Sequence, residues 1–536
     1  MPVTAAPAAP DVHKSPMESP HEEMARHMWR NSISNYLAMG LRMALGVVMF
    51  GVLKQGLHTE EFGFWTLLWS VFGFGILLDF GFGFTAVKKV AELSVHQNWT
   101  ELSQVLSTIF YLYVVIALII VGIAFGFSHA LIGMFNISPP NREIFRQIMV
   151  LFFCGIGIGF PLGIFPEILI GQQRIFLANM IFSVTGVLNF VFITVAIRQH
   201  LGLRTIVIIS LASAIVPSAL CGACALKKLP HVKLLPKYFS PKMIVETLRF
   251  SVFTYISTLS NMILGKTDRL VIGIVQAVSS VALYETGAKV GEVFGTFTNQ
   301  LPDTFSPAAA HLHAKGEKEV LRRLLLDGTR FSVMIATPAF LIGLFYMQGM
   351  IAFLSRDRTF YFETFWVGEI LLTWQFVTLL TQSVTKRIFM MCGHERKLMW
   401  MGLGEALLNL VLSVSLIVKF HNVIGVALGS LIATMVFGFG YILPWAAKEA
   451  ELSLMGMLRK VLFPTLRGCL PLVAYLLLTF YSPWLDYRKS SIIMIGQCVL
   501  GMFIGFIGLW NYAMTTSDRF QVARKFPRIF KAGKTA

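Results

Sequence analysis

Ionisable side chains recur at helical spacing inside segments that are otherwise apolar. Polar residues between 285 and 303 follow one another at intervals of 4, 3, 4, 3 and 4, which places them along one face of an α-helix. Just upstream, three charged residues interrupt an apolar stretch from 250 to 275 and share one side of a helical wheel with hydroxyl and amide side chains. The first set is Glu285, Lys289, Glu292, Thr296, Asn299 and Asp303; the second is Lys266, Asp268 and Arg269 with Ser251, Thr254, Thr258 and Asn261.

These residue types indicate a site that holds an anion and handles a cation. Guanidinium and ammonium groups suit a phosphate, which Arg can grip with two hydrogen bonds. A charge facing lipid at the bilayer centre would cost at least about 2.5–3.5 kcal/mol, so the two polar faces are expected to line a shared chamber between helices. Nearby carboxylates could take up H⁺ or Na⁺, and the candidate ion-coupling residues are Asp79, Asp268, Glu285 and Glu292.

Two charges from the first part of the chain are expected at the same chamber. Arg42 lies inside the first apolar segment, and Asp79 lies inside the second, in ILLDFGFGF. Arg42 could pair with Asp79, and Arg269 or Lys266 could pair with Glu285 across a short external turn. The alternative for each pair is a structural ion pair that only fixes the register of two helices.

The depth of each residue within its predicted span favours either a functional or a structural role. Glu167 and Glu405 lie near cytoplasmic helix ends, where a structural role is favoured. Ionisable groups deeper in a membrane segment usually mark substrate or ion pathways. A functional role is therefore favoured for Arg42, Asp268, Arg269, Lys289 and Glu292.

The elements that carry these residues are predicted to be membrane-spanning helices. Of the 536 residues, 55% are hydrophobic and only 14% are charged, whereas a soluble domain is about 25% charged. About fourteen apolar segments are long enough to cross a bilayer. They lie near 33–55, 64–87, 105–127, 147–170, 175–197, 204–226, 249–275, 280–304, 331–351, 365–385, 399–418, 423–446, 461–480 and 490–511.

The distribution of Lys and Arg orients these helices. Basic residues concentrate in alternate connections, around 227–242, 315–323, 386–397 and 519–534. The positive-inside rule then places both termini in the cytoplasm, with residues 1–29 as a loose tail and 514–536 as a basic tail. The net charge of +17 is explained by this topology and by anionic lipid, so a nucleic-acid partner is not expected.

An internal repeat divides the chain. VLNFVFITVAI (187–197) resembles LLNLVLSVSLI (407–417), and SLASAIV (210–216) resembles SLIATMV (430–436), both at an offset of 220. GQQR (171–174) resembles GHER (393–396) at an offset of 222. We predict two six-helix lobes, 30–228 and 243–448, related by a pseudo-two-fold axis along the membrane normal, with two additional helices in 455–513.

Several stretches together resemble a known family. They are EEFGFWTLLWSVFGFGILLDFGFGFTAVKKVAE (60–92), KTDRLVIGIVQAVSSVALYETGAKV (266–290), PDTFSPAAA (302–310) and the GQQR and GHER loops. From Arg30 to Ala446 the chain resembles the oligosaccharide (O-antigen type) flippases of the multidrug/oligosaccharidyl-lipid/polysaccharide exporter superfamily.

The resemblance implies a function and a place in the cell. Such flippases move undecaprenyl-diphosphate-linked oligosaccharide across the bacterial inner membrane by alternating access during polysaccharide and lipopolysaccharide synthesis. They use an H⁺ or Na⁺ gradient, no cofactor and no metal, and a glycan polymerase is the candidate protein partner. The substrate-binding charges of the central cavity map to Arg42, Lys266, Arg269 and Lys289. The additional pair of helices resembles that of the related lipid II flippases.

Two rival functions remain. A drug or cation exporter of the same superfamily would prefer an acidic, aromatic chamber. A membrane glycosyltransferase or polymer ligase would need a large external loop with catalytic groups, and the predicted external loops are short. No Walker A motif is present. The protein is therefore expected to be a transporter and not an enzyme.

Overall fold

The architecture is that of a computed structural model. It describes residues 20–519 except 81, 304, 306–308, 310–311, 314, 483–489 and 517. Over this range the chain forms helices and no strand, as predicted. The predicted tail at 1–29 is already helical from Pro20, and residues 1–19 and 520–536 lie outside the described range.

Eleven of the described helices are long and apolar enough to cross a membrane. A helix is one of the few structures that satisfies its own backbone hydrogen bonds in lipid. The three other predicted spans, 64–87, 249–275 and 280–304, have helices in the structure but do not count among the eleven. Two of these three, 249–275 and 280–304, carry the charged face.

The first half of the chain forms a set of long helices joined by short turns. Pro161 and Gly163 mark the point where one predicted span divides into α5 and α6. The elements are α1 (Pro20–Gly56), α2 (Thr59–Phe74), the 3₁₀ helix η1 (Gly75–Asp79), α3 (Phe82–Val95), α4 (Trp99–Gly133), η2 (Pro139–Asn141), α5 (Arg142–Leu162), α6 (Ile164–Gly171), α7 (Ile175–Arg198) and α8 (Gly202–Lys228).

The second half repeats this plan and adds two helices at its end. Its elements are η3 (Pro236–Tyr238), α9 (Pro241–Val275), α10 (Val278–Thr298), α11 (Gln300–Asp303), α13 (Lys318–Phe345), α14 (Met347–Ser355), α15 (Phe362–Thr378), the π-helix η4 (Leu379–Ser383), α16 (Val384–Met391), α17 (Glu395–Phe420), α18 (Ile424–Phe437), the π-helix η5 (Gly438–Ile442), α19 (Leu443–Glu449), α20 (Leu454–Tyr481), α21 (Ser491–Gly508) and the π-helix η7 (Leu509–Ala513).

The same turn geometry recurs in the two halves. Before α4, the amide of Asn98 donates to the carbonyl of Leu93 at 3.1 Å, and Gln97 has φ +52°. Before α13, the amide of Glu317 donates to the carbonyl of Leu312 at 3.1 Å, and Gly316 has φ +73°. The offset is 219 residues, and the starts of α2 and α10 differ by the same number. The duplicated plan is thus present in backbone geometry as well as in sequence.

The loop pair GQQR and GHER needs a different alignment. The amide of Arg174 donates to the carbonyl of Leu169, and the amide of His394 donates to that of Phe389. The residues just before them, Gln173 and Gly393, both have positive φ. The structural offset is therefore 220, and the offset of 222 was wrong because letter similarity ignored which residue must adopt the left-handed conformation.

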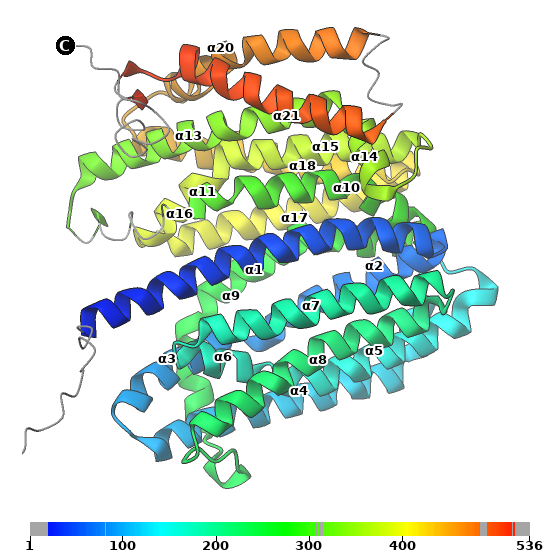
Figure 1. The fold of residues 1–536 in the computed structure, drawn as a ribbon, viewed down its shortest axis with the longest axis vertical. Coiled ribbons are helices and arrows are strands. Elements are labelled where there is room, and N and C mark those ends of the chain that lie inside the picture. Colours follow the sequence, from blue (N-terminus) through cyan, green and yellow to red (C-terminus); the bar gives the residue numbers. More distant parts are fainter. Residues whose placement is uncertain are drawn as a thin grey trace, which may run out of the picture.

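Helices of each half pack mainly on one another, and the halves meet at a narrower contact. α4 packs on α5 and α7 on α1 and α8, whereas α10 packs on α15 and α17 on α18 and α9. The halves join where α2 packs against α9 and α10, and where α1 packs against α14 (Figure 1). The additional helices α20 and α21 lie against α13 at the far end of the molecule (Figure 1). The lobe boundaries at 228 and 243 stay a prediction.

Candidate functional site

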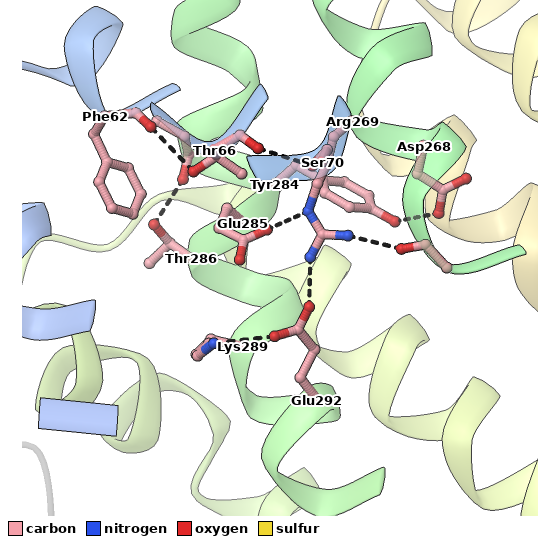
Figure 2. A network of polar contacts seen from close by, with 12 residues as sticks. Phe62, Thr66, Ser70, Asp268, Arg269, Tyr284, Glu285, Thr286, Lys289 and Glu292 are labelled. Carbon is pink, nitrogen blue, oxygen red and sulfur yellow. Dashed lines mark hydrogen bonds and ion pairs between the residues drawn. The ribbon is translucent and has the colours of Figure 1, made fainter. Parts of the chain in front are cut away.

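The charged face of α10 meets Arg269 of α9 at the junction between the halves. Arg269 is 5% exposed, and its Nε donates to Glu285 Oε2 at 2.6 Å while Nη2 donates to Glu292 Oε1 at 2.5 Å. Its Nη1 donates to the carbonyl of Gly265 at 2.8 Å. Glu285 and Glu292 are two helical turns apart on one face, so a single guanidinium reaches both (Figure 2). The predicted pairing of Arg269 with Glu285 is confirmed.

Lys289 completes this network from the same face of α10. Its Nζ donates to Glu292 Oε2 at 3.0 Å and lies 5.5 Å from the ring centroid of Phe50 on α1. Glu292 therefore uses one carboxylate oxygen for Arg269 and the other for Lys289. Lys266 forms no ion pair or hydrogen bond with the described residues, although it is half-buried. The site thus holds one paired and one unpaired lysine.

A cavity of about 310 Å³ adjoins these side chains. Its charged wall comes from α9 and α10, and its other wall from α1 and α2, so it lies between the halves. Trp65 and Trp69 supply aromatic surface on that second wall. The lining residues are Gly46, Met49, Phe50, Leu53, Phe62, Trp65, Thr66, Trp69, Ser70, Lys266, Arg269, Glu285, Lys289 and Glu292.

A second cavity of about 310 Å³ brings Arg42 to the site. It shares Gly46, Lys289 and Glu292 with the first cavity, so the two adjoin. Arg42 is exposed and forms no ion pair within the described part of the chain. Arg42, Lys266, Arg269 and Lys289 therefore border two adjoining cavities, and these four cations outnumber the two carboxylates Glu285 and Glu292.

The first half contributes hydroxyl groups where the second half has charges. At the repeat offset of 219, Thr66 corresponds to Glu285 and Ser70 to Lys289. Both hydroxyls donate to carbonyls of their own helix, Thr66 to Phe62 and Ser70 to Thr66 (Figure 2). The sequence interpretation missed these two residues and the two tryptophans. The constant offset could have located Thr66 and Ser70, because they align with predicted site residues. The chamber is consequently asymmetric, with most of its charge on one lobe.

Asp268 does not border this chamber, which corrects the predicted common face. Its Oδ2 accepts hydrogen bonds from Tyr284 Oη at 2.6 Å and from Ser430 Oγ at 3.0 Å. Ser430 Oγ in turn accepts one from Asn409 Nδ2 at 2.8 Å. Asp268 is 5% exposed, because α10 and α18 cover its side of α9. The neighbouring Arg269 points instead towards Glu285 and Glu292 of α10. Successive residues on a helix point about 100° apart, which suffices to separate them.

The expected pairing of Arg42 with Asp79 is wrong for the described residues. Asp79 lies in a third cavity, of about 390 Å³, inside the first half. Its carboxylate accepts hydrogen bonds from Tyr113 Oη and from the amide of Gly83 at 3.1 Å. The physical reason is that α2 gives way to a 3₁₀ turn at 75–79, so Asp79 satisfies a free amide at the start of α3 and not an arginine on α1.

Glu405 belongs to a buried structural cluster. It is 1% exposed and accepts hydrogen bonds from Gln382 Nε2 at 2.9 Å, Thr434 Oγ1 at 2.8 Å and Lys386 Nζ at 3.2 Å. With its carboxylate fully surrounded, Glu405 fits the structural role favoured for it. No group of His, Cys, Asp and Glu suited to a metal occurs among the described residues.

Known proteins resemble this chain in sequence pattern and in fold. The family model described as "Polysaccharide biosynthesis protein" matches residues 28–299. A structure described as lipid II flippase MurJ in an inward closed conformation is similar, with a TM-score of 0.67, 15% identity, and coverage of 93% of this chain and 99% of that chain. No curated protein matches the chain.

Two transporters of the MOP superfamily share the fold as well. An inward-facing multidrug resistance MATE family transporter has a TM-score of 0.60 and 16% identity, covering 76% of this chain and 94% of that chain. A MOP superfamily transporter from Pyrococcus furiosus is described as having a binding pocket of reverse polarity. It has a TM-score of 0.56 and 16% identity, covering 79% of this chain and 95% of that chain. This multi-pass membrane protein therefore has a MurJ- and MATE-like fold, and because the family model spans more than half of the chain, it belongs to the polysaccharide biosynthesis protein family.

Proposed function

We propose that the protein is a flippase that carries polyprenyl-diphosphate-linked oligosaccharide, with undecaprenyl as the carrier, across the bacterial inner membrane. The observation that carries the proposal is the excess of cations on two adjoining cavities between the two halves. In a membrane interior such an excess is costly unless an anion or water compensates it. A diphosphate carries more than one negative charge and suits Lys and Arg together.

The hydrogen-bond pattern supports a division of labour among the cations. Arg269 is fully engaged by Glu285, Glu292 and a backbone carbonyl, so it organises the site. Lys266 and Arg42 have no carboxylate partner in the described part of the chain and are free to meet an incoming phosphate. Lys289 lies on both cavities and could exchange Glu292 for the substrate.

This exchange would couple substrate to ion movement. A diphosphate that draws Lys289 away leaves Glu292 less well neutralised, and such a carboxylate gains affinity for H⁺ or Na⁺. Asp268 offers a second coupling group, because its Oδ1 is buried without a partner among the described residues, as is Oδ1 of Asn409. A buried acceptor without a donor is unfavourable, and a proton or cation would relieve it. Asp79, in the separate cavity, is not needed for this step.

The rival functions fit the site less well. An exporter of cationic drugs would have to bind its substrate against the excess positive charge between the halves. A glycosyltransferase would need an external catalytic domain, whereas the described turns at 57–58, 199–201, 276–277, 356–361 and 421–423 are short. Transport with both termini in the cytoplasm is therefore our proposal.

The test removes the two cations that hold no ion pair. Arg42→Ala combined with Lys266→Ala leaves the Arg269 network intact, so the variant should fold. In cells that lack their own flippase, this variant should fail to restore surface glycan, and lipid-linked glycan should accumulate in the inner leaflet. Lys419→Ala, at an exposed position that lines neither cavity, is the control. Normal surface glycan in the double variant would rule out the proposed phosphate site.

A further inference from the structure

The cavity inside the first half has a composition opposite to that of the central chamber. Its volume is about 390 Å³, which lies within the range of roughly 300–1,000 Å³ that small-molecule sites occupy. Two carboxylates, Asp79 and Glu167, face it, and no Lys or Arg is among its lining residues. The aromatic lining residues are Trp69, Phe72, Tyr113 and Phe160.

The two carboxylates are not explained by protein contacts alone. Glu167 has no ion pair or hydrogen bond to the described residues, and Asp79 is bonded only to Tyr113 and the Gly83 amide. A Cβ added at Gly83 would lie 3.5 Å from the carboxylate oxygens of Asp79 and 3.5 Å from Cγ of Glu167. The two acidic side chains therefore flank this glycine. Two carboxylates that hold no ion pair in the described structure imply water or a polar ligand in the cavity.

Trp69 is common to this cavity and to the central chamber. It is among the lining residues of both, and its ring packs edge-on against Trp65 at 5.6 Å and against Phe72 at 5.3 Å. Its Nε1 is buried and has no hydrogen-bond partner in the described structure. Buried indole N–H groups normally have a partner, so this donor is available to a ligand at the boundary of the two spaces.

We infer that this cavity is a subsite for the first sugar of the lipid-linked glycan. In a sugar diphosphate the anomeric carbon is bonded directly to a phosphate oxygen, so the sugar must lie next to the diphosphate. A cavity that shares a wall with the cationic chamber satisfies this requirement. The inference rests on the proposed function for the diphosphate itself.

The chemistry of the lining matches a sugar ring. Sugar hydroxyls are hydrogen-bond donors, and the carboxylates of Asp79 and Glu167 are pure acceptors. The C–H faces of a pyranose can lie against aromatic faces, which Phe72, Phe160 and Trp69 supply. The Trp69 N–H can donate to a sugar or bridging oxygen. Glu167, for which sequence position favoured a structural role, becomes a sugar-binding residue.

The test separates the sugar from the diphosphate by comparing two ligands. Affinities are measured on the purified full-length protein for farnesyl diphosphate and for farnesyl diphosphate linked to one sugar, as glucosyl, galactosyl and N-acetylglucosaminyl forms. At least one sugar form should bind about tenfold more tightly than bare farnesyl diphosphate, the gain of roughly one well-formed buried hydrogen bond to a charged group. Glu167→Gln should abolish that gain without changing the affinity for bare farnesyl diphosphate.

Matched variants identify the source of each effect. Glu369→Gln removes another carboxylate of a spanning helix that lines neither cavity, and it should keep the sugar gain. Lys266→Ala should weaken both ligands equally. If no ligand binds, the proposed function fails; if bare and sugar-linked diphosphate bind equally, the proposed function stands and the sugar subsite is overturned.

A second pair of probes tests the competing occupant. An acidic, aromatic cavity could also hold a lipophilic cation. Tetraphenylphosphonium and tetraphenylborate have similar shapes and opposite charges. One result would overturn the sugar subsite in favour of a cation site. In that result only the cation binds saturably, Glu167→Gln abolishes its binding, and the sugar gives no gain in affinity. Retention of the sugar gain with weak or equal binding of the two ions supports the inference.

Discussion

At the scale of single residues, the site is built around one guanidinium that satisfies two acids. Arg269 is bonded to Glu285 and Glu292, and its own exposure is 5%. Desolvating such a cluster is expensive, so it is a poor source of stability compared with an apolar core. Glu292 accepts hydrogen bonds from both Arg269 and Lys289, and in the proposed mechanism a coupling ion could take the place of Lys289.

The first prediction follows from the cost of leaving buried acids unpaired. Arg269→Gln should lower the free energy of unfolding by about 3–5 kcal/mol, the usual cost of removing one partner from a buried ion pair. Adding Glu285→Gln and Glu292→Gln should restore most of that loss, because neutral amides need no counter-ion. Thermal unfolding in detergent measures both effects. An Arg269→Gln protein as stable as wild type would show that the network is not stabilised in this way.

At the scale of elements, the carboxylate of Glu60 at the start of α2 helps to position this helix. Glu60 Oε1 accepts from the amide of Ser138 at 2.7 Å, and Oε2 accepts from Ser138 Oγ and from Asn141 Nδ2, each at 2.6 Å. Glu60 thereby ties the start of α2 to the connection between α4 and α5. α2 carries Trp69 and the hydroxyl wall of the chamber, so this clasp helps to position one side of the site.

The clasp predicts a pH dependence. Partial burial acts to raise the pKa of Glu60, but the hydrogen bonds from Ser138 and Asn141 outweigh it, and the net pKa is lowered. Because the folded pKa lies below the unfolded value of about 4.3, the stabilisation is present above that value and is lost as pH falls through the folded pKa. Glu60→Gln should therefore lower the melting temperature at pH 7.

Acidification provides the check on this assignment. The difference in melting temperature between wild type and Glu60→Gln should shrink from pH 7 towards pH 4 and below, as the wild-type carboxylate becomes protonated. Glu317→Gln, at an exposed carboxylate elsewhere, should show little difference at either pH. A gap that stays constant with pH would mean that the Glu60 charge is irrelevant to stability.

At the scale of the whole molecule, the halves are closed together at the predicted external end. The Asn136 amide donates to the carbonyl of Gly273 at 3.1 Å, and the Val278 amide donates to the carbonyl of Asn136 at 3.3 Å. A Cβ at Gly63 would lie 2.0 Å from the carbonyl oxygen of Val278, so α2 and α10 touch backbone to backbone there. If the proposed alternating access operates, this contact has to open.

Disrupting this contact should shift the conformational equilibrium. Gly63→Ala cannot be accommodated by a side-chain movement, because the obstructing atom is backbone, and it should favour separation of the external ends. Spin labels at Gln199, in the turn after α7, and at Phe420, the last residue of α17, both at the predicted external end, should report a longer distance. Gly122→Ala, where an added Cβ meets nothing within 4 Å, is the matched control. Unchanged distances in Gly63→Ala would indicate that the outer contact does not limit opening.

The amount that could be predicted from sequence differs between fold and site. Hydropathy and helical period were sufficient for the eleven spans found among the described helices, since lipid leaves a chain few ways to satisfy its backbone. The spacing of Glu285, Lys289 and Glu292 also sufficed to place them on one face. The predicted pairing of Arg42 with Asp79 was wrong, and the sequence pattern could not have shown this. A 3₁₀ turn changes the direction of the Asp79 side chain, and helical periodicity does not record such a turn.

The sequence by itself determined that this protein is a duplicated bundle of membrane helices with a charged face on its second half, because composition, period and repeat offset are properties of the chain alone. Only the tertiary structure decided that Asp268 lies apart from Arg269's chamber, that Asp79 and Glu167 share an acidic cavity, and that Trp69 borders both spaces. The physical reason is that a cavity is formed by residues from several helices, and their relative rotation depends on packing between helices that are distant in sequence.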